Sequence, residues 1–134
     1  MPLVRIDVNQ GRTPKQLQML SRGMREAIVA EYGIPARDYF HVMTEHPAGQ
    51  ILAQDAGLGF ERTPDVVMIQ IFTQAGRSQA ARQSLFAAVA EHLAAIGVAG
   101  EDVLIGYVEN TAGDWSFGFG RARYATGELG VPGK

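Results

Sequence analysis

An internal repeat at about half the chain length is the feature that most constrains the fold. Two pairs of segments match, namely VRIDVNQGRT (4–13) with IQIFTQAGRS (69–78) and YGIPARD (32–38) with IGVAGED (96–102). The two matches differ in offset by only one residue, so the register nearly holds across a whole supersecondary unit. We therefore expect a single domain over residues 1–134, built from pseudo-repeats at 1–46 and 65–110 and followed by a tail at 111–134.

The first repeat predicts a strand, a helix and a second strand. Apolar residues alternate with polar ones over residues 4–9, which is the pattern of a strand with one polar side. Thr13 is a good N-cap, and Gln16, three residues later, completes a capping box. A stripe of apolar residues at helical spacing follows, formed by Leu17, Leu20, Met24, Ala27 and Ile28. Gly33 is suited to end this helix, and we expect the second strand at 39–43.

The second repeat predicts the same three elements. A strand at 66–72 precedes Ser78, which is placed to cap the second helix, and Gly97 ends that helix. Its apolar side is expected to be formed by Leu85, Val89, His92, Leu93 and Ile96. A fourth strand is expected at 103–108. Two consecutive βαβ units with right-handed crossovers place both helices on one face of a four-stranded mixed sheet, which is an α/β (α+β) fold.

The third predicted strand is apolar on both of its faces, with Met68 on one side of the alternation and Ile69 and Ile71 on the other. Helices on one face of the sheet leave the other face uncovered, and parallel sheets are usually buried on both sides. We therefore expect the second face to contact neighbouring subunits. The connection at 47–64 is expected to be an ordered loop with a short strand at residues 51–52.

Composition excludes several classes of function. The chain is 46% hydrophobic and 19% charged, with a net charge of −2 and acidic and basic residues mixed along it. There is no polybasic segment for nucleic acid or anionic lipid, and no apolar run long enough to cross a membrane. Cysteine is absent, and the three histidines lack the spacing of a metal site. We expect a cytoplasmic protein with neither nucleic-acid nor membrane partners.

Pro2 directly follows the initiator methionine. Removal of Met1 would leave a free secondary amine, and an α-amino group titrates near ~8, so its surroundings can move it across neutral pH. Neutral, such an amine acts as a general base; protonated, it acts as an acid or polarises a carbonyl. Many proteins begin Met-Pro without catalytic use of the proline, so Pro2 by itself is weak evidence.

Two pairs of charged residues stand at equivalent places in the repeats. Arg12 and Arg77 each precede a helix N-cap, where a cation is mildly disfavoured unless it serves a purpose such as binding an anionic substrate. The alternative is that both side chains point into solvent. Asp38 and its counterpart Asp102 stand at the corners before a strand, where closure of a turn is the simpler interpretation from the residues alone.

Four aromatic residues cluster in the tail, namely Trp115, Phe117, Phe119 and Tyr124. The simpler interpretation is that they pack the tail against the rest of the domain. The alternative is that they form the wall of an apolar pocket.

Taken together, these residues resemble the tautomerase superfamily and, within it, the malonate semialdehyde decarboxylase family. The resemblance covers nearly the whole chain. Its more specific motifs are GIPARD (33–38), GLGFERT (57–63), DVV (65–67), DWSFGFGRA (114–122) and TGEL (126–129).

This resemblance implies a homotrimer without a cofactor that acts on a small carboxylate. It implies that Pro2 is protonated and polarises the β-carbonyl of a 3-oxo acid, that Asp38 assists, and that arginines hold the carboxylate. Arg77 is then the anchor. Trp115, Phe117 and Leu129 match positions that line the apolar pocket of the family.

The sequence departs from the family just before the second helix. The family has an Arg-Pro-Arg-Thr run there, whereas this chain has QAGRS at residues 74–78. Arg77 corresponds to the second arginine if one residue is inserted, and Gln74 replaces the first. Tyr124 stands where the family has phenylalanine. The expected substrate-binding residues are thus Trp115, Phe117 and Leu129, completed by Gln74, Tyr124 and Arg12.

The leading hypothesis is a decarboxylase of malonate semialdehyde or a related 3-oxo acid. The same residues with a neutral Pro2 would make a keto–enol tautomerase of 2-oxo acids of the phenylpyruvate type, and a cationic Pro2 would suit a hydratase of unsaturated acids. A non-catalytic trimeric scaffold is a further alternative.

Overall fold

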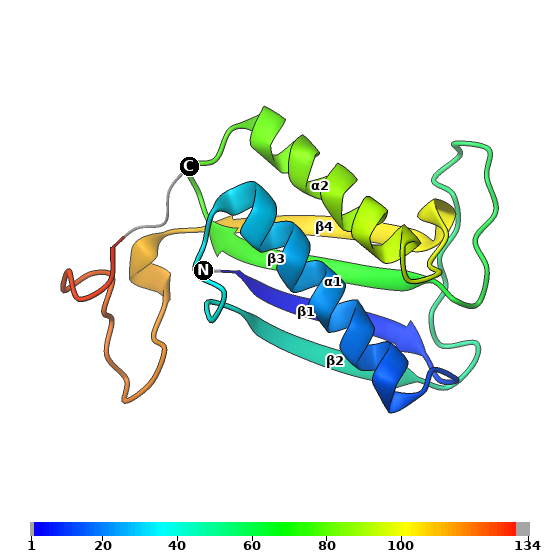
Figure 1. The fold of residues 1–134 in the computed structure, drawn as a ribbon, viewed down its shortest axis with the longest axis horizontal. Helices are drawn as coiled ribbons and strands as arrows, with labels where there is room; N and C mark the ends of the chain where they lie inside the picture. Colours follow the sequence, from blue (N-terminus) through cyan, green and yellow to red (C-terminus); the bar gives the residue numbers. More distant parts are fainter. Residues whose placement is uncertain (1, 131–134) are drawn as a thin grey trace.

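Two helices pack on one face of a four-stranded sheet, as the repeat predicts (Figure 1). The computed structural model describes residues 2–130. Its elements are β1 (Leu3–Asn9), α1 (Pro14–Tyr32), β2 (Phe40–His46), β3 (Val67–Gln74), α2 (Gln79–Ala94) and β4 (Val103–Asn110), with short 3-10 turns at Gly100–Asp102 and Ala112–Asp114.

The order of strands in the sheet brings distant parts of the chain to a common end. The order is β2-β1-β3-β4, with β1 parallel to β2, β3 parallel to β4, and β1 antiparallel to β3. One end of the sheet, here called the proline end, therefore holds the starts of β1 and β2 and the ends of β3 and β4. At the opposite end, called the loop end, β1 and β2 finish and β3 and β4 begin. The tail lies beyond the proline end, and the connection between β2 and β3 lies at the loop end (Figure 1).

Both helices begin at the residues that the sequence indicates. At α1, the Thr13 hydroxyl accepts a bond from the Gln16 N–H, and the Gln16 side chain accepts one from the Thr13 N–H, at 3.2 and 2.8 Å. Gly33 ends α1 with a φ of 62°, a left-handed conformation that glycine adopts without steric cost. At α2, the Ser78 hydroxyl accepts a bond from the Ala81 N–H at 3.1 Å. Local capping chemistry thus sets the place of both crossover helices.

The core lies between the helices and the inner face of the sheet. It contains alternate residues of β1 and β3 together with the apolar sides of the helices, among them Val4, Ile6, Val8, Leu20, Met24, Ile28, Ile69, Ile71, Leu85, Val89 and Leu93. The outer face is different. Phe40, Val42 and Val108 are at least 40% exposed there, so the apolar character expected of this face is present without a cover within the chain.

Three strands end later than the sequence predicts, and one predicted strand is wrong. β2 runs to His46 because its seven residues pair one by one with β1 from Leu3 to Asn9. β3 and β4 run further than expected because Gln74 still pairs with Asn110. The short strand predicted at residues 51–52 is not formed, since the connection makes local turns and the Asp55 carboxylate accepts bonds from two nearby N–H groups instead.

Candidate active site

The fold gathers the predicted catalytic residues at the proline end of the sheet. Pro2 is buried and immediately precedes β1, and Asp38 lies two residues before β2. Gln74 is the last residue of β3, and Arg77 precedes the N-cap of α2. Because β1 and β2 start where the antiparallel β3 finishes, residues from both repeats meet at this end.

Arg77 is held in place by the protein through only part of its guanidinium. Its side chain is 7% exposed, its Nη1 donates to the Thr73 hydroxyl at 3.2 Å, and its Cζ lies 4.0 Å from the centre of the Tyr32 ring. Nε and Nη2 are buried and have no hydrogen-bond partner. These two nitrogens form one edge of the guanidinium, which is the geometry that binds a carboxylate through two parallel bonds.

Asp38 is buried, and its carboxyl group, like the Arg77 guanidinium, has an atom without a hydrogen-bond partner. The residue is 8% exposed, and its Oδ1 has no partner. Burial raises the pKa of Asp38, while the positive charge at the amino terminus of the chain and the Arg77 guanidinium oppose that rise. One oxygen of the buried Asp38 carboxyl group is thus available to a partner at the proline end.

Gln74 and Tyr124 complete the polar part of the site. Gln74 is 3% exposed, and neither atom of its amide has a partner of regular hydrogen-bond geometry. Burial raises the pKa of Tyr124, as does the negative charge of Asp38, while the neighbouring Gln74 amide and Arg77 lower it. Tyr124 of the tail therefore lies near Asp38 of the first repeat and near Gln74 and Arg77 of the second.

Aromatic rings form one side of this site and are called here the aromatic wall, comprising Phe40, Trp115, Phe117 and Tyr124. The Phe117 ring is stacked on Trp115 at 5.6 Å and on Phe40 at 5.6 Å, and it meets Tyr124 edge-on at 5.4 Å. The Trp115 indole donates to the Asn110 side chain at 2.6 Å, which ties the wall to the end of β4. Leu129 follows on the same tail and is partly exposed.

The loop end carries the repeat counterparts of the site residues, but these are satisfied within the chain. Arg12 donates from Nη2 to the Asp65 carbonyl oxygen at 2.6 Å. Asp102 is 2% exposed and accepts bonds from both the N–H and the hydroxyl of Thr63, at 2.7 and 2.5 Å. Within one chain, Arg12 therefore lies at the other end of the sheet from Pro2, and its expected substrate contact stays a prediction.

Sequence reasoning missed the residues that hold Arg77. Tyr32 packs its ring against the guanidinium, and its hydroxyl bonds to that of Tyr107 at 2.9 Å. The signal that could have found Thr73 is a polar residue in the inward register of β3, where Val67, Ile69 and Ile71 are apolar. Tyr32 gave no such signal, because a tyrosine at the end of an apolar stripe is an ordinary core residue.

Among residues 2–130, no three histidine or acidic side chains come together in a way that could hold a metal ion. In that same part of the chain, no helix is long and apolar enough to cross a membrane.

Comparison with known proteins shows the family of this chain. Two family models, both described as tautomerase enzyme, match residues 38–118 and 2–61. A probable tautomerase, YrdN of Bacillus subtilis (strain 168), is 35% identical over 130 residues, covering 96% of this chain and all of the relative. The chain belongs to the tautomerase superfamily. A second relative of this superfamily, the probable tautomerase YusQ of the same organism, is 32% identical over 92% of this chain and 98% of its own.

Solved structures in this superfamily have the same fold. FG41 malonate semialdehyde decarboxylase inhibited by 3-bromopropiolate is 51% identical, with a TM-score of 0.95, over 97% of this chain and 99% of its own. A second malonate semialdehyde decarboxylase is 33% identical, with a TM-score of 0.91, over 95% and 98%. A fused 4-OT asymmetric trimer is 26% identical, with a TM-score of 0.73, over 92% and 98%. The chain is thus a tautomerase-superfamily enzyme whose solved neighbours include malonate semialdehyde decarboxylases.

Proposed function

We propose that this enzyme decarboxylates malonate semialdehyde or a related 3-oxo acid, with Pro2 as its acid. The observation that carries the proposal is a set of buried polar atoms without partners at the proline end: Asp38 Oδ1, both amide atoms of Gln74, and Arg77 Nε and Nη2. Leaving such atoms unpaired costs free energy that a folded protein normally avoids. The carboxylate and carbonyl oxygens of a bound substrate would accept hydrogen bonds from the three nitrogens of Gln74 and Arg77, and the protonated Pro2 amine would donate to Asp38 Oδ1. The 51% identical decarboxylase neighbour supports the same reaction.

Arg77 sets the class of substrate. Its free edge binds one carboxylate, and the amide of Gln74 adds neutral hydrogen bonds without a second positive charge. The nearby Asp38 carboxylate disfavours a second negative group on the substrate. We therefore infer a short monocarboxylate as the substrate.

Pro2 and Asp38 carry the chemical step. With Met1 removed, the protonated Pro2 amine donates a hydrogen bond to the 3-oxo oxygen, and Asp38 favours the charged form of the amine. The bond between the carboxylate carbon and C2 breaks, and its electron pair moves through C2 toward the polarised carbonyl. Carbon dioxide leaves, and the resulting enolate takes up a proton to give the aldehyde. Stabilisation of the developing oxyanion by a fixed cation is the largest contribution expected in such a site.

The aromatic wall supports this step by excluding water. The stacked rings of Trp115, Phe117 and Phe40 present apolar surface beside the polar groups. In such an environment, the charge of Pro2 acts more strongly on the carbonyl than it would in water.

A second candidate is the keto–enol tautomerisation of a 2-oxo acid of the phenylpyruvate type. The observation in its favour is that both curated relatives are probable tautomerases. In this reaction a neutral Pro2 would act as base, with the same Arg77 edge on the carboxylate. The protonation state of Pro2 is therefore what separates the two functions.

We further propose that the enzyme is a homotrimer. The outer sheet face exposes Phe40, Val42 and Val108, and a related solved structure is a fused 4-OT trimer. A trimer would cover this face, because an uncovered apolar face of this kind marks an interaction surface.

The experiment compares wild type with Pro2→Ala on malonate semialdehyde and on phenylenolpyruvate. Intact mass first establishes that Met1 is absent from both proteins. We expect Pro2→Ala to lose about 10²-fold or more of the decarboxylation rate, since it replaces the secondary amine of the site. Pro14→Ala is the matched control, because Pro14 begins α1 at the loop end. Decarboxylation by Pro2→Ala at the wild-type rate would contradict the proposal, and turnover of phenylenolpyruvate alone would favour the second candidate.

A further inference from the structure

The tail beyond β4 places a side chain in the site although it has little regular structure. Residues 115–130 form neither helix nor strand. Tyr124, in the middle of this segment, is 8% exposed and completes the aromatic wall. A segment without a hydrogen-bond ladder opens locally at low free energy, so something else has to hold Tyr124 in place.

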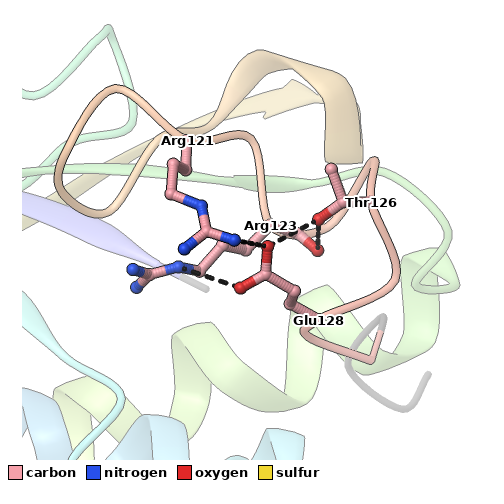
Figure 2. Close-up of polar contacts among 4 residues, drawn as sticks. All are labelled: Arg121, Arg123, Thr126 and Glu128. Atoms are coloured by element: carbon pink, nitrogen blue, oxygen red, sulfur yellow. Dashed lines mark hydrogen bonds and ion pairs between the residues drawn. The ribbon is translucent and has the colours of Figure 1, made fainter.

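Glu128 is the centre of the contacts that fold this segment back on itself (Figure 2). Its Oε1 accepts from Arg121 Nη2 at 2.6 Å, and its Oε2 lies 3.4 Å from Arg123 Nε. The Thr126 hydroxyl lies 3.1 Å from Glu128 Oε1 and 3.2 Å from the Arg123 carbonyl oxygen. The acidic side chain thus contacts two cations, one before and one directly beside Tyr124.

Backbone contacts in the same turn make the position of Tyr124 depend on this cluster. The Gly127 N–H donates to the Tyr124 carbonyl oxygen at 3.3 Å, and the Leu129 N–H donates to that of Arg123 at 3.2 Å. Glu128 lies between these two donors in the chain. Loss of its ion pairs would therefore loosen the turn on both sides of Tyr124.

We propose that Glu128 is a positioning residue for the active site: by pairing with Arg121 and Arg123, it holds Tyr124 and the aromatic wall against Gln74 and Arg77. The cluster is half-exposed, so its contribution to global stability is small. Its effect is on geometry, where a displacement of about 1 Å can cost up to about 10²-fold in rate. The kinetic consequence rests on the proposed function, whereas the structural consequence does not.

The single tryptophan of the chain reports on the structural consequence. Trp115 stacks on Phe117, which in turn contacts Tyr124. The Trp115 fluorescence emission of full-length wild type, Glu128→Gln and Glu26→Gln is compared without ligand. Glu26→Gln is the matched control, because it makes the same change of charge in an exposed ion pair with Arg22 on α1. We expect the Trp115 emission to change in Glu128→Gln and to stay at the wild-type value in Glu26→Gln.

The kinetic experiment uses the same three proteins on a 3-oxo acid at low and high salt. We expect Glu128→Gln to lower kcat/KM about tenfold at low salt, while its melting temperature stays near that of wild type. Because salt screens exposed ion pairs, the ratio of wild-type to variant kcat/KM should fall toward one as salt rises.

The outcomes separate this inference from the proposed function. Wild-type emission and wild-type kcat/KM in Glu128→Gln would overturn the role of Glu128. So would a loss of activity that only matches a loss of folded protein, or an equal loss in Glu26→Gln. A wild-type protein that turns over no 3-oxo acid contradicts the proposed function, and the emission comparison still decides whether Glu128 positions the wall.

Discussion

The two ends of the sheet carry equivalent residues from the two repeats, and they differ in whether those residues are paired. At the loop end, Arg12 and Asp102 bond to Asp65 and Thr63. At the proline end, Arg77 and Asp38 keep buried polar atoms without partners. The same residue types are structural where the chain supplies their partners and are available to a ligand where it does not. The repeat therefore gives two similar ends, and the unpaired atoms lie at the proline end.

The largest effect expected from this comparison concerns the two arginines. Arg77→Lys keeps a positive charge but loses the two-nitrogen edge, so we expect kcat/KM on a 3-oxo acid to fall about 10²-fold. Arg12→Lys should change it far less, because Arg12 is engaged at the loop end of its own chain. Steady-state kinetics on both variants make the test. An equal loss in Arg12→Lys would show that a neighbouring subunit brings Arg12 into the site.

The two aspartates should separate stability from activity. Asp102→Asn disrupts a buried carboxylate that accepts two bonds from Thr63, and we expect it to lower the free energy of unfolding by about 1–3 kcal/mol while activity per folded molecule is kept. Asp38→Asn should instead lose activity. Denaturant unfolding and steady-state kinetics are measured on the two variants. The same effect of both substitutions on the free energy of unfolding and on activity would contradict the difference between the two ends.

The pH dependence of Asp38 sharpens this contrast. Burial raises the pKa of Asp38 in the folded protein, so the folded state binds its proton more tightly than the unfolded state does. The cost of the ionised Asp38 is absent below its ordinary pKa, grows as pH rises from that value to the raised one, and is constant above it. We therefore expect Asp38→Asn to be more stable than wild type at neutral pH and to lose that advantage in acid, as melting temperatures across pH would show.

The smallest effect is expected at the helix caps. Thr13→Ala and Ser78→Ala should each lower the free energy of unfolding by about 1 kcal/mol, since each removes a bond to the first turn of a helix. Only Ser78→Ala should also lower kcat/KM, because Ser78 directly follows Arg77. A kinetic loss in Thr13→Ala would contradict the division between the two ends.

Much of the fold could be predicted from local patterns. Thr13 with Gln16, Ser78 and Gly33 mark helix ends through contacts a few residues apart, and the alternation in β1 marks its buried face. Strand bounds were less accurate, because the pairing of β2 with β1 extends it to His46. The strand predicted at residues 51–52 failed because the connection has no partner strand there and bonds to itself instead.

For the site, the sequence by itself determined the candidates, and tertiary structure decided among them. The repeat fixes two helices and four strands through periodicity and capping, which are local properties. Whether Arg12 or Arg77 stays available depends on partners such as Asp65, 53 positions from Arg12 in the chain, and no local pattern encodes that contact. The connection at the loop end folds back and satisfies Arg12 and Asp102. At the proline end, Arg77 and Asp38 keep unpaired atoms beside Pro2, and the tail adds Tyr124 and the aromatic wall.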